Sequence, residues 1–103
     1  MSKTAELNSK LQAAEDLDLR FATFRHYKGG IYTVEDFVVD TDDGSLRVLY
    51  FRVGGPDYDA DAEVGIRFVR PIGEFLGMNE DGVPRFQRVR RVETWVDDEG
   101  ASA

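Results

Sequence analysis

Hydrophobic and polar positions alternate with a period of two in the middle of the chain, which is typical of β-strands with one buried face. The segment 31–40 (IYTVEDFVVD) is rich in β-branched and aromatic residues, and Tyr32 and Val34 share one face in that alternation. The adjacent acids Glu35-Asp36 interrupt the alternation. We therefore expect a strand over 31–40 with a bulge or bend at these acids.

A second strand is predicted over 46–53 (LRVLYFRV), which is apolar on both faces between its two arginines. This pattern is typical of a central strand or of one that another element covers. The intervening residues 41–45 contain aspartates and a glycine, which favour a turn. Together these features predict a β-hairpin of 31–40 with 46–53.

A third strand is predicted over 64–70 (VGIRFVR), with Val64, Ile66 and Phe68 on one face. Pro71 would end this strand because proline has no backbone N–H to donate to a neighbouring strand.

Shorter elements are predicted after this strand. Proline at the start and glycine just past the end predict a single helical turn near 71–76. Residues 79–82 (NEDG) predict another turn. A last strand is expected to begin near Arg85 and to run as far as Val96.

The first 22 residues follow a helical rather than an alternating pattern. Apolar residues recur at helical spacing and predict a short amphipathic helix over 5–16 with Thr4 as its N-cap; they are Leu7, Leu11, Ala14 and Leu17. A frayed N-terminal extension is the alternative. The chain thus divides into an extension over 1–22, a domain over 23–96 and a polar tail over 97–103.

Several short, bent strands joined by glycine-rich turns within about 70 residues are typical of a small all-β barrel. An SH3-like barrel matches this size best. The predicted fold class is therefore all-β, an SH3-like barrel with a short N-terminal helix and one helical turn near 71–76.

The composition bounds the classes of function. A length of 103 residues predicts a single domain. The net charge of −7 disfavours non-specific binding to nucleic acid or to anionic membranes, because both are negatively charged. The chain has no cysteine, no apolar run that spans a bilayer and no secretory signal, so we expect a cytoplasmic protein. The charge is uneven: residues 35–63 carry nine acids and two arginines, and residues 64–91 carry six arginines and three acids.

Motifs for catalysis and for cofactors are not recognisable. His26 is the one histidine, and none of the serines lies in a nucleophile elbow. The glycine pair Gly29-Gly30 matches neither pattern of a phosphate loop and predicts a tight turn instead. The acidic loop over 57–63 begins like a calcium loop, but the glycine and glutamate that such a loop requires are replaced by Ala62 and Phe68. We expect a protein that is not an enzyme and that has no cofactor and no metal site.

Basic residues flank the predicted strand ends, and small barrels bring such ends together. They predict an anion-binding site whose candidate residues are Arg25, His26, Lys28, Arg70 and Arg85. Tyr27 and Tyr32 are candidates for an aromatic lining of this site, although both also suit the core. The alternative is that the cations pair with the chain's own acids and only solvate the barrel.

Four blocks in the middle of the chain carry a family resemblance: FRHYKGGIYTV at 24–34, VLYFR at 48–52, RFVRPIGEF at 67–75 and VPRFQRV at 83–89. Their order resembles the small bacterial family known as domain of unknown function 1653. The resemblance implies an SH3-type β-barrel and no particular activity. The chain departs from the family pattern in Phe68, where a tryptophan is usual, and in a longer acidic loop over 54–63. The residues that match the pattern are Arg25, His26, Tyr27, Lys28, Gly29, Tyr32, Arg70, Pro71, Phe75, Arg85 and Phe86.

Two hypotheses of function follow from the sequence. The first is a binding module that recognises an anionic ligand or an acidic protein segment; nucleic acid is possible but is disfavoured by the net charge. The second is a structural domain that forms a homodimer through the 46–53 strand and the N-terminal helix.

Overall fold

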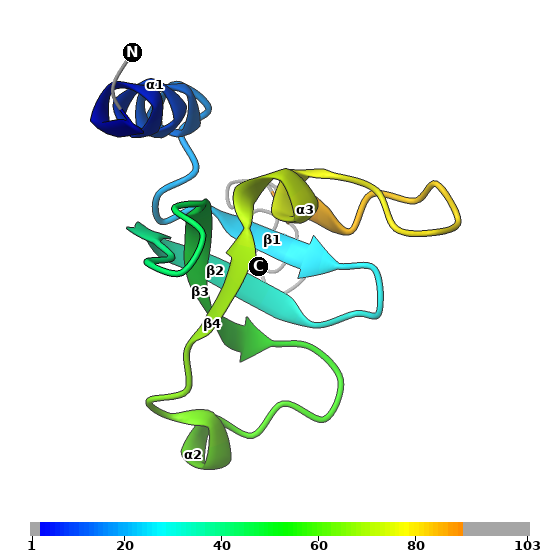
Figure 1. Cartoon of the computed structure of the whole chain (residues 1–103). Helices are drawn as coiled ribbons and strands as arrows, with labels where there is room; N and C mark the ends of the chain where they lie inside the picture. Colours follow the sequence, from blue (N-terminus) through cyan, green and yellow to red (C-terminus); the bar gives the residue numbers. More distant parts are fainter. Residues whose placement is uncertain (1–2, 90–103) are drawn as a thin grey trace.

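A computed structural model describes residues 3–89 of the chain; nothing is described of residues 1–2 and 90–103. These residues form five strands and three helices, in the order α1-β1-β2-β3-α2-β4-α3-β5 (Figure 1). The strands are β1 (Thr23–His26), β2 (Ile31–Val39), β3 (Leu46–Gly54), β4 (Phe68–Pro71) and β5 (Phe86–Val89). The helices are α1 (Lys3–Asp16), α2 (Ala60–Glu63) and α3 (Ile72–Leu76). No helix among the described residues is long and apolar enough to cross a membrane.

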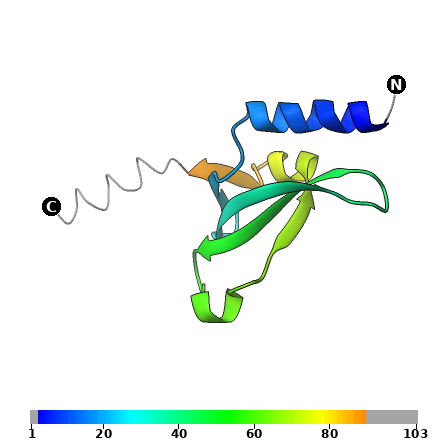
Figure 2. The same cartoon turned by 90° about the vertical axis from the view of Figure 1, so that its left-hand side faces the viewer.

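The five strands form one antiparallel sheet in the order β4-β3-β2-β1-β5, which curls into a half-barrel. Figure 2 shows α1 lying along one side of this sheet, with α2 at the opposite end of the molecule. The fold is therefore mostly β with a few helices, as the sequence predicts. The sequence pattern did not predict β1, which pairs with both β2 and β5.

The β2–β3 hairpin confirms the predicted pairing of 31–40 with 46–53. Val34 lies opposite Tyr50 and Asp36 opposite Leu49, so Glu35 is the extra residue of a bulge. The predicted interruption at Glu35-Asp36 is thus confirmed. β3 lies between β2 and β4, which also confirms its central position.

The sheet has an inner face that carries the core and an outer face. Side chains alternate between the two faces along each strand, so cross-strand partners such as Phe24 and Tyr32 share the inner face. The buried core comprises Ala14, Leu19, Phe24, Val34, Val48, Tyr50, Phe75 and Phe86. Most of these residues come from the sheet, and Phe75 of α3 packs on the inner face against Phe24, Tyr50 and Phe86.

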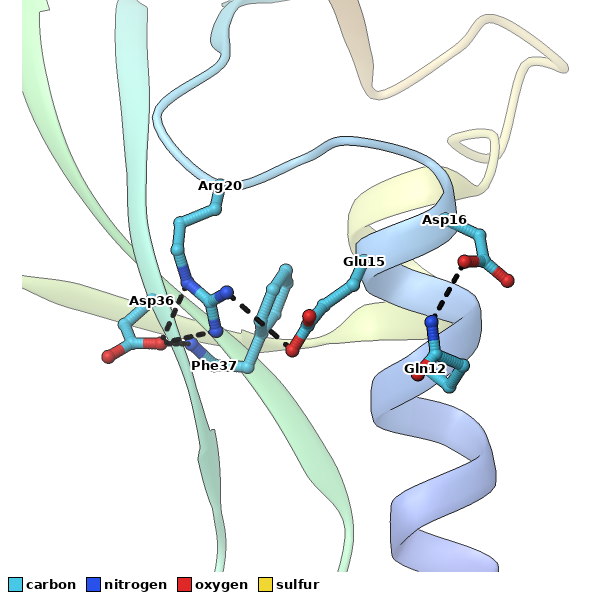
Figure 3. Close-up of polar contacts among 6 residues, drawn as sticks. All are labelled: Gln12, Glu15, Asp16, Arg20, Asp36 and Phe37. Atoms are coloured by element: carbon cyan, nitrogen blue, oxygen red, sulfur yellow. Dashed lines mark hydrogen bonds and ion pairs between the residues drawn. The ribbon is translucent and has the colours of Figure 1, made fainter.

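Helix α1 joins the core through Ala14, and Leu19 of the following loop is buried beside it. Figure 3 shows how the loop fixes the end of the helix: Arg20 contacts Glu15 of α1 at 3.6 Å and Asp36 of β2 at 3.0 Å. The Phe37 backbone N–H and the Arg20 guanidinium hold the pKa of Asp36 below its ordinary value. The helix begins at Lys3, so the predicted N-cap at Thr4 is wrong.

The predicted third strand over 64–70 is wrong in its first half. Residues 64–67 form a turn and an irregular segment instead. The acidic loop predicted over 57–63 contains the short helix α2, which the Asp59 carboxylate caps by accepting from the backbone N–H groups of Asp61 and Ala62. The chain then turns through Gly65 at a φ of +83°, and Val64 is 79% exposed. The strand begins only at Phe68.

The predicted elements after Pro71 agree with the structure as far as residue 89. α3 spans Ile72–Leu76, with Pro71 before it and Gly77 at its end. The backbone N–H of Gly82 donates to the carbonyl of Asn79 in the predicted turn. β5 begins one residue after the predicted start, and its predicted continuation to Val96 lies outside the described residues.

Candidate functional site

The buried ring of Phe86 forms the floor of the candidate site on the inner face. Phe86 lies directly opposite His26 in the β1–β5 pairing, and the centres of their rings are 4.9 Å apart. The ring of Phe75 stacks on Phe86 with the centres 4.1 Å apart. The guanidinium of Arg70 lies over the same ring at 6.0 Å from its centre. The site therefore joins β1, β4, β5 and α3.

His26 is held in one tautomer by the turn that follows β1. Its Nδ1 accepts a hydrogen bond of 3.1 Å from the backbone N–H of Lys28. In the neutral ring the proton must then be on Nε2, which is left as a donor. The turn itself depends on Gly29, whose φ of +106° is unfavourable for other residues.

Three cations act on this histidine. Burial lowers the pKa of His26, and the nearby charges of Arg70, Lys28 and Arg85 lower it further. The structure thus brings together four of the five predicted anion-binding residues. Arg25 is the exception, because it alternates with His26 along β1 and so belongs to the outer face.

Arg70 is a half-buried cation whose polar contacts are long. Its Nε lies 3.5 Å from the Tyr50 hydroxyl, and its Nη1 lies 3.5 Å from the Glu74 carboxylate. Charge-assisted hydrogen bonds between a guanidinium and a carboxylate are ordinarily about 2.7–2.9 Å long. The N–H groups of Arg70 therefore have only distant acceptors within the protein. The side chain is 29% exposed, so these groups face the solvent in part.

Arg85 has a similar shortage of acceptors. Its Nη2 lies 3.4 Å from the carbonyl of Met78, and its buried Nε has no hydrogen-bond partner among the described residues. Arg85 also lines an open polar cavity of about 200 Å³. The other residues of this cavity are Tyr27, Asn79, Glu80 and Asp81. Two acids therefore line the same cavity as Arg85, but neither makes an ion pair with it within 4 Å.

Five other arginines among the described residues have closer partners, whereas the Arg25 side chain is exposed on the outer face and has no ion pair or hydrogen bond with the described residues. Arg20, Arg47 and Arg67 approach carboxylate oxygens at 3.0, 3.0 and 2.6 Å. Arg52 donates to the carbonyl of Gly54 at 3.0 Å, and Arg88 donates to the carbonyl of Leu17 at 3.0 Å. Pairing with the chain's own acids or carbonyls thus accounts for these five arginines but not for Arg70 and Arg85.

An aromatic rim, formed by Tyr27, His26, Tyr32 and Phe68, borders these cations. Neighbouring rings along the rim have centres 4.4, 6.3 and 5.9 Å apart. Tyr27 is 44% exposed and Phe68 is 36% exposed, so the rim faces solvent at both ends. The prediction that Tyr27 fills the core is wrong, whereas Tyr32 packs against the core as expected. Lys28 extends from the rim, with its amine 5.7 Å from the centre of the Tyr27 ring.

Phe68 and Glu74 belong to this region and were missed by the sequence reasoning. Phe68 precedes Arg70 by two residues, so strand alternation puts both on the inner face. Glu74 follows Arg70 by four residues, and that spacing is the signal that could have indicated their contact.

The family model for a protein of unknown function, DUF1653, matches residues 22–88, which is more than half of the chain. The chain belongs to this family. The DUF1653 match includes β1 to β4, α2, α3, all of β5 except Val89 and every residue of the candidate site, and α1 lies before it. No curated protein and no solved structure matches the chain.

Proposed function

We propose that this DUF1653 protein is a small binding module and not an enzyme, and that its curled sheet is a variant of the SH3-like barrel. The module recognises an anionic group at a site formed by His26, Lys28, Arg70 and Arg85, with the aromatic rim beside it. Its ligand is a small anion or an acidic segment of a protein partner in the cytoplasm.

One observation carries this proposal: Arg70 and Arg85 lack the close acceptors that five other arginines have. A guanidinium needs several acceptors, and a half-buried one without them loses favourable hydrogen bonds. An anionic oxygen near Arg70, Arg85 and the Nε2–H of His26 would supply them. The aromatic rings at the border reduce the exposure of such an ion pair to water and so strengthen it.

The proposal is tested with inorganic phosphate and tetraglutamate as probes, at a pH of about 7.5. Because His26 is the one histidine in the chain, its ring resonances in the NMR spectrum report directly on the site. We expect at least one of the two probes to shift these resonances to saturation. The double variant Arg70→Gln, Arg85→Gln should lose the saturable shift.

A matched control removes the same charge from the outer face. Arg25→Gln with Arg47→Gln also lowers the positive charge by two, but it leaves the site intact, since Arg47 alternates with the buried Val48 along β3 and so lies on the outer face. This control should bind like the natural chain. The proposal is wrong if neither probe gives a saturable shift, or if both double variants weaken binding equally, since a general effect of net charge would then explain the result.

A further inference from the structure

The carboxylate of Glu74 lies nearest to the candidate site, and its geometry indicates what the site accepts. Glu74 comes from α3 and reaches Arg70 at 3.5 Å, with 57% of its side chain exposed. The Arg67–Glu35 pair on the outer face is much closer, at 2.6 Å. Glu74 therefore approaches Arg70 without closing a normal ion pair, and exposed pairs of this kind contribute little to stability.

We infer that the site binds a single carboxylate group carried on an aromatic or apolar body, and that Glu74 occupies the place of that carboxylate in the free protein. This inference rests on the proposed function and specifies its ligand. The incoming carboxylate displaces Glu74 and takes donors from Arg70 and from the Nε2–H of His26. The body of the ligand then lies on the aromatic rim.

The charges around the site favour one carboxylate over phosphate groups. Glu74 lies 3.5 Å from Arg70, and Glu80 and Asp81 line the same polar cavity as Arg85. A chain of phosphates that followed both arginines would meet all three acids. A phosphate dianion would also be repelled more strongly by them than a carboxylate that carries one charge.

The aromatic rim explains why the carboxylate should have an apolar neighbour. The Tyr32 ring contacts the rings of His26, Phe68 and Phe86, with centres 5.9–6.3 Å apart. Phe68 remains 36% exposed at the end of this row, on the same strand face as Arg70. Ring stacking on such a surface adds affinity that a bare carboxylate does not gain.

The test compares phenylacetate, acetate and inorganic phosphate by titration of the His26 ring resonances at a pH of about 7.5. We expect phenylacetate to bind more tightly than acetate and phosphate. The Glu74→Gln variant should bind phenylacetate about two- to fivefold more tightly, because it loses the competing carboxylate. The control Glu35→Gln removes the same charge on the outer face and should leave the affinity unchanged.

The outcomes separate this inference from the proposed function. If phosphate gives a saturable, Arg70-dependent shift and phenylacetate gives none, the inference is wrong while the proposed function stands. If no anion binds, both are wrong. Equal affinity for acetate and phenylacetate would overturn the role of the aromatic rim, and an unchanged affinity in Glu74→Gln would overturn the role of Glu74.

A blocked Glu-Phe dipeptide that binds more tightly than phenylacetate would identify a protein segment as the source of the carboxylate, and the reverse order would identify a small acid.

Discussion

At the scale of single residues, His26 contributes both to the fold and to the candidate site. Its Nδ1 accepts from the backbone N–H of Lys28, and its ring packs against Phe86. Both contacts suit the neutral imidazole, and three neighbouring cations oppose its protonation. The same residue that orders the turn is therefore kept uncharged, with one N–H free to donate.

This arrangement predicts how stability changes with pH. The pKa of His26 in the folded protein is lowered by burial, Arg70, Lys28 and Arg85, whereas in the unfolded chain it should be about 6.5. The unfolded chain therefore binds the proton more readily, so the stabilisation is complete above a pH of about 6.5 and is lost as the pH falls below it. Urea unfolding at several pH values between about 5 and 7.5 measures the slope.

The variant His26→Gln provides the comparison for this prediction. Glutamine does not titrate, so the variant should show a smaller loss of stability across the same range of pH. The acids titrate in both proteins, and their contribution cancels in the difference. Equal slopes in the two proteins would show that His26 does not change its pKa on folding.

At the scale of elements, two turns support each other next to the site. The turn after β1 contains Gly29, and the loop after β3 contains Gly55 and Pro56. A Cβ atom added to Gly29 would lie 3.2 Å from the Pro56 ring. A Cβ added to Gly55 would lie 2.6 Å from the carbonyl oxygen of Gly29. Close backbone contact between the two turns thus fixes the segment that carries His26 and Lys28.

The variant Gly55→Ala tests this contact, and Gly65→Ala is its control. Both glycines have positive φ, +102° and +83°, so both substitutions carry the same backbone penalty. Only Gly55 has a neighbouring backbone atom in the way, since a Cβ at Gly65 would meet nothing within 4 Å. We expect Gly55→Ala to lower the free energy of unfolding by about 1–3 kcal/mol more than Gly65→Ala in urea unfolding. Equal losses of stability in the two variants would mean that the loop after β3 shifts away from Gly29 at no cost in free energy.

The elements that the sequence predicted well are those with a strong local pattern. The β2–β3 hairpin has alternating apolar residues and a turn rich in aspartate and glycine, and α3 has proline and glycine at its ends. The strand predicted from Val64 begins only at Phe68 because the chain turns at Val64 and Gly65, where Gly65 has a φ of +83°. The alternating apolar residues of this segment do not reveal that turn. β1 has only four residues and depends on pairing with two distant strands, so no local pattern could predict it.

The sequence indicated most residues of the candidate site, but it did not indicate which of them lack a close hydrogen-bond acceptor. Four of the five predicted residues lie together because β1, β4 and β5 meet around Phe86. Arg25 was assigned to the wrong face, since the phase of β1 could not be known without its partners. Which arginines lack a close acceptor depends on contacts between residues far apart in the chain, such as Arg67 with Glu35, and these contacts require the structure.

At the scale of the whole molecule, the outer face of the sheet is the surface through which an assembly domain would associate. Val53 and Val69 are 39% and 51% exposed on this face. Phe51 lies on β3, two residues before Val53. The Arg67 guanidinium covers its ring at 4.7 Å and pairs with Glu35 at 2.6 Å. A charged pair over the largest apolar side chain of a face opposes association through that face.

We therefore expect a monomer, with Arg67 as the residue that keeps the outer face from self-association. Light scattering of the natural chain at two concentrations that differ tenfold should give the same mass. The variant Arg67→Ala uncovers Phe51 next to Val69 and should increase the mass at the higher concentration. Arg25→Ala removes an equal charge from the same face without uncovering an aromatic ring, and it should remain a monomer. A mass that rises with concentration in the natural chain would favour the homodimer instead, because the Arg67–Glu35 pair would then not prevent association through the outer face.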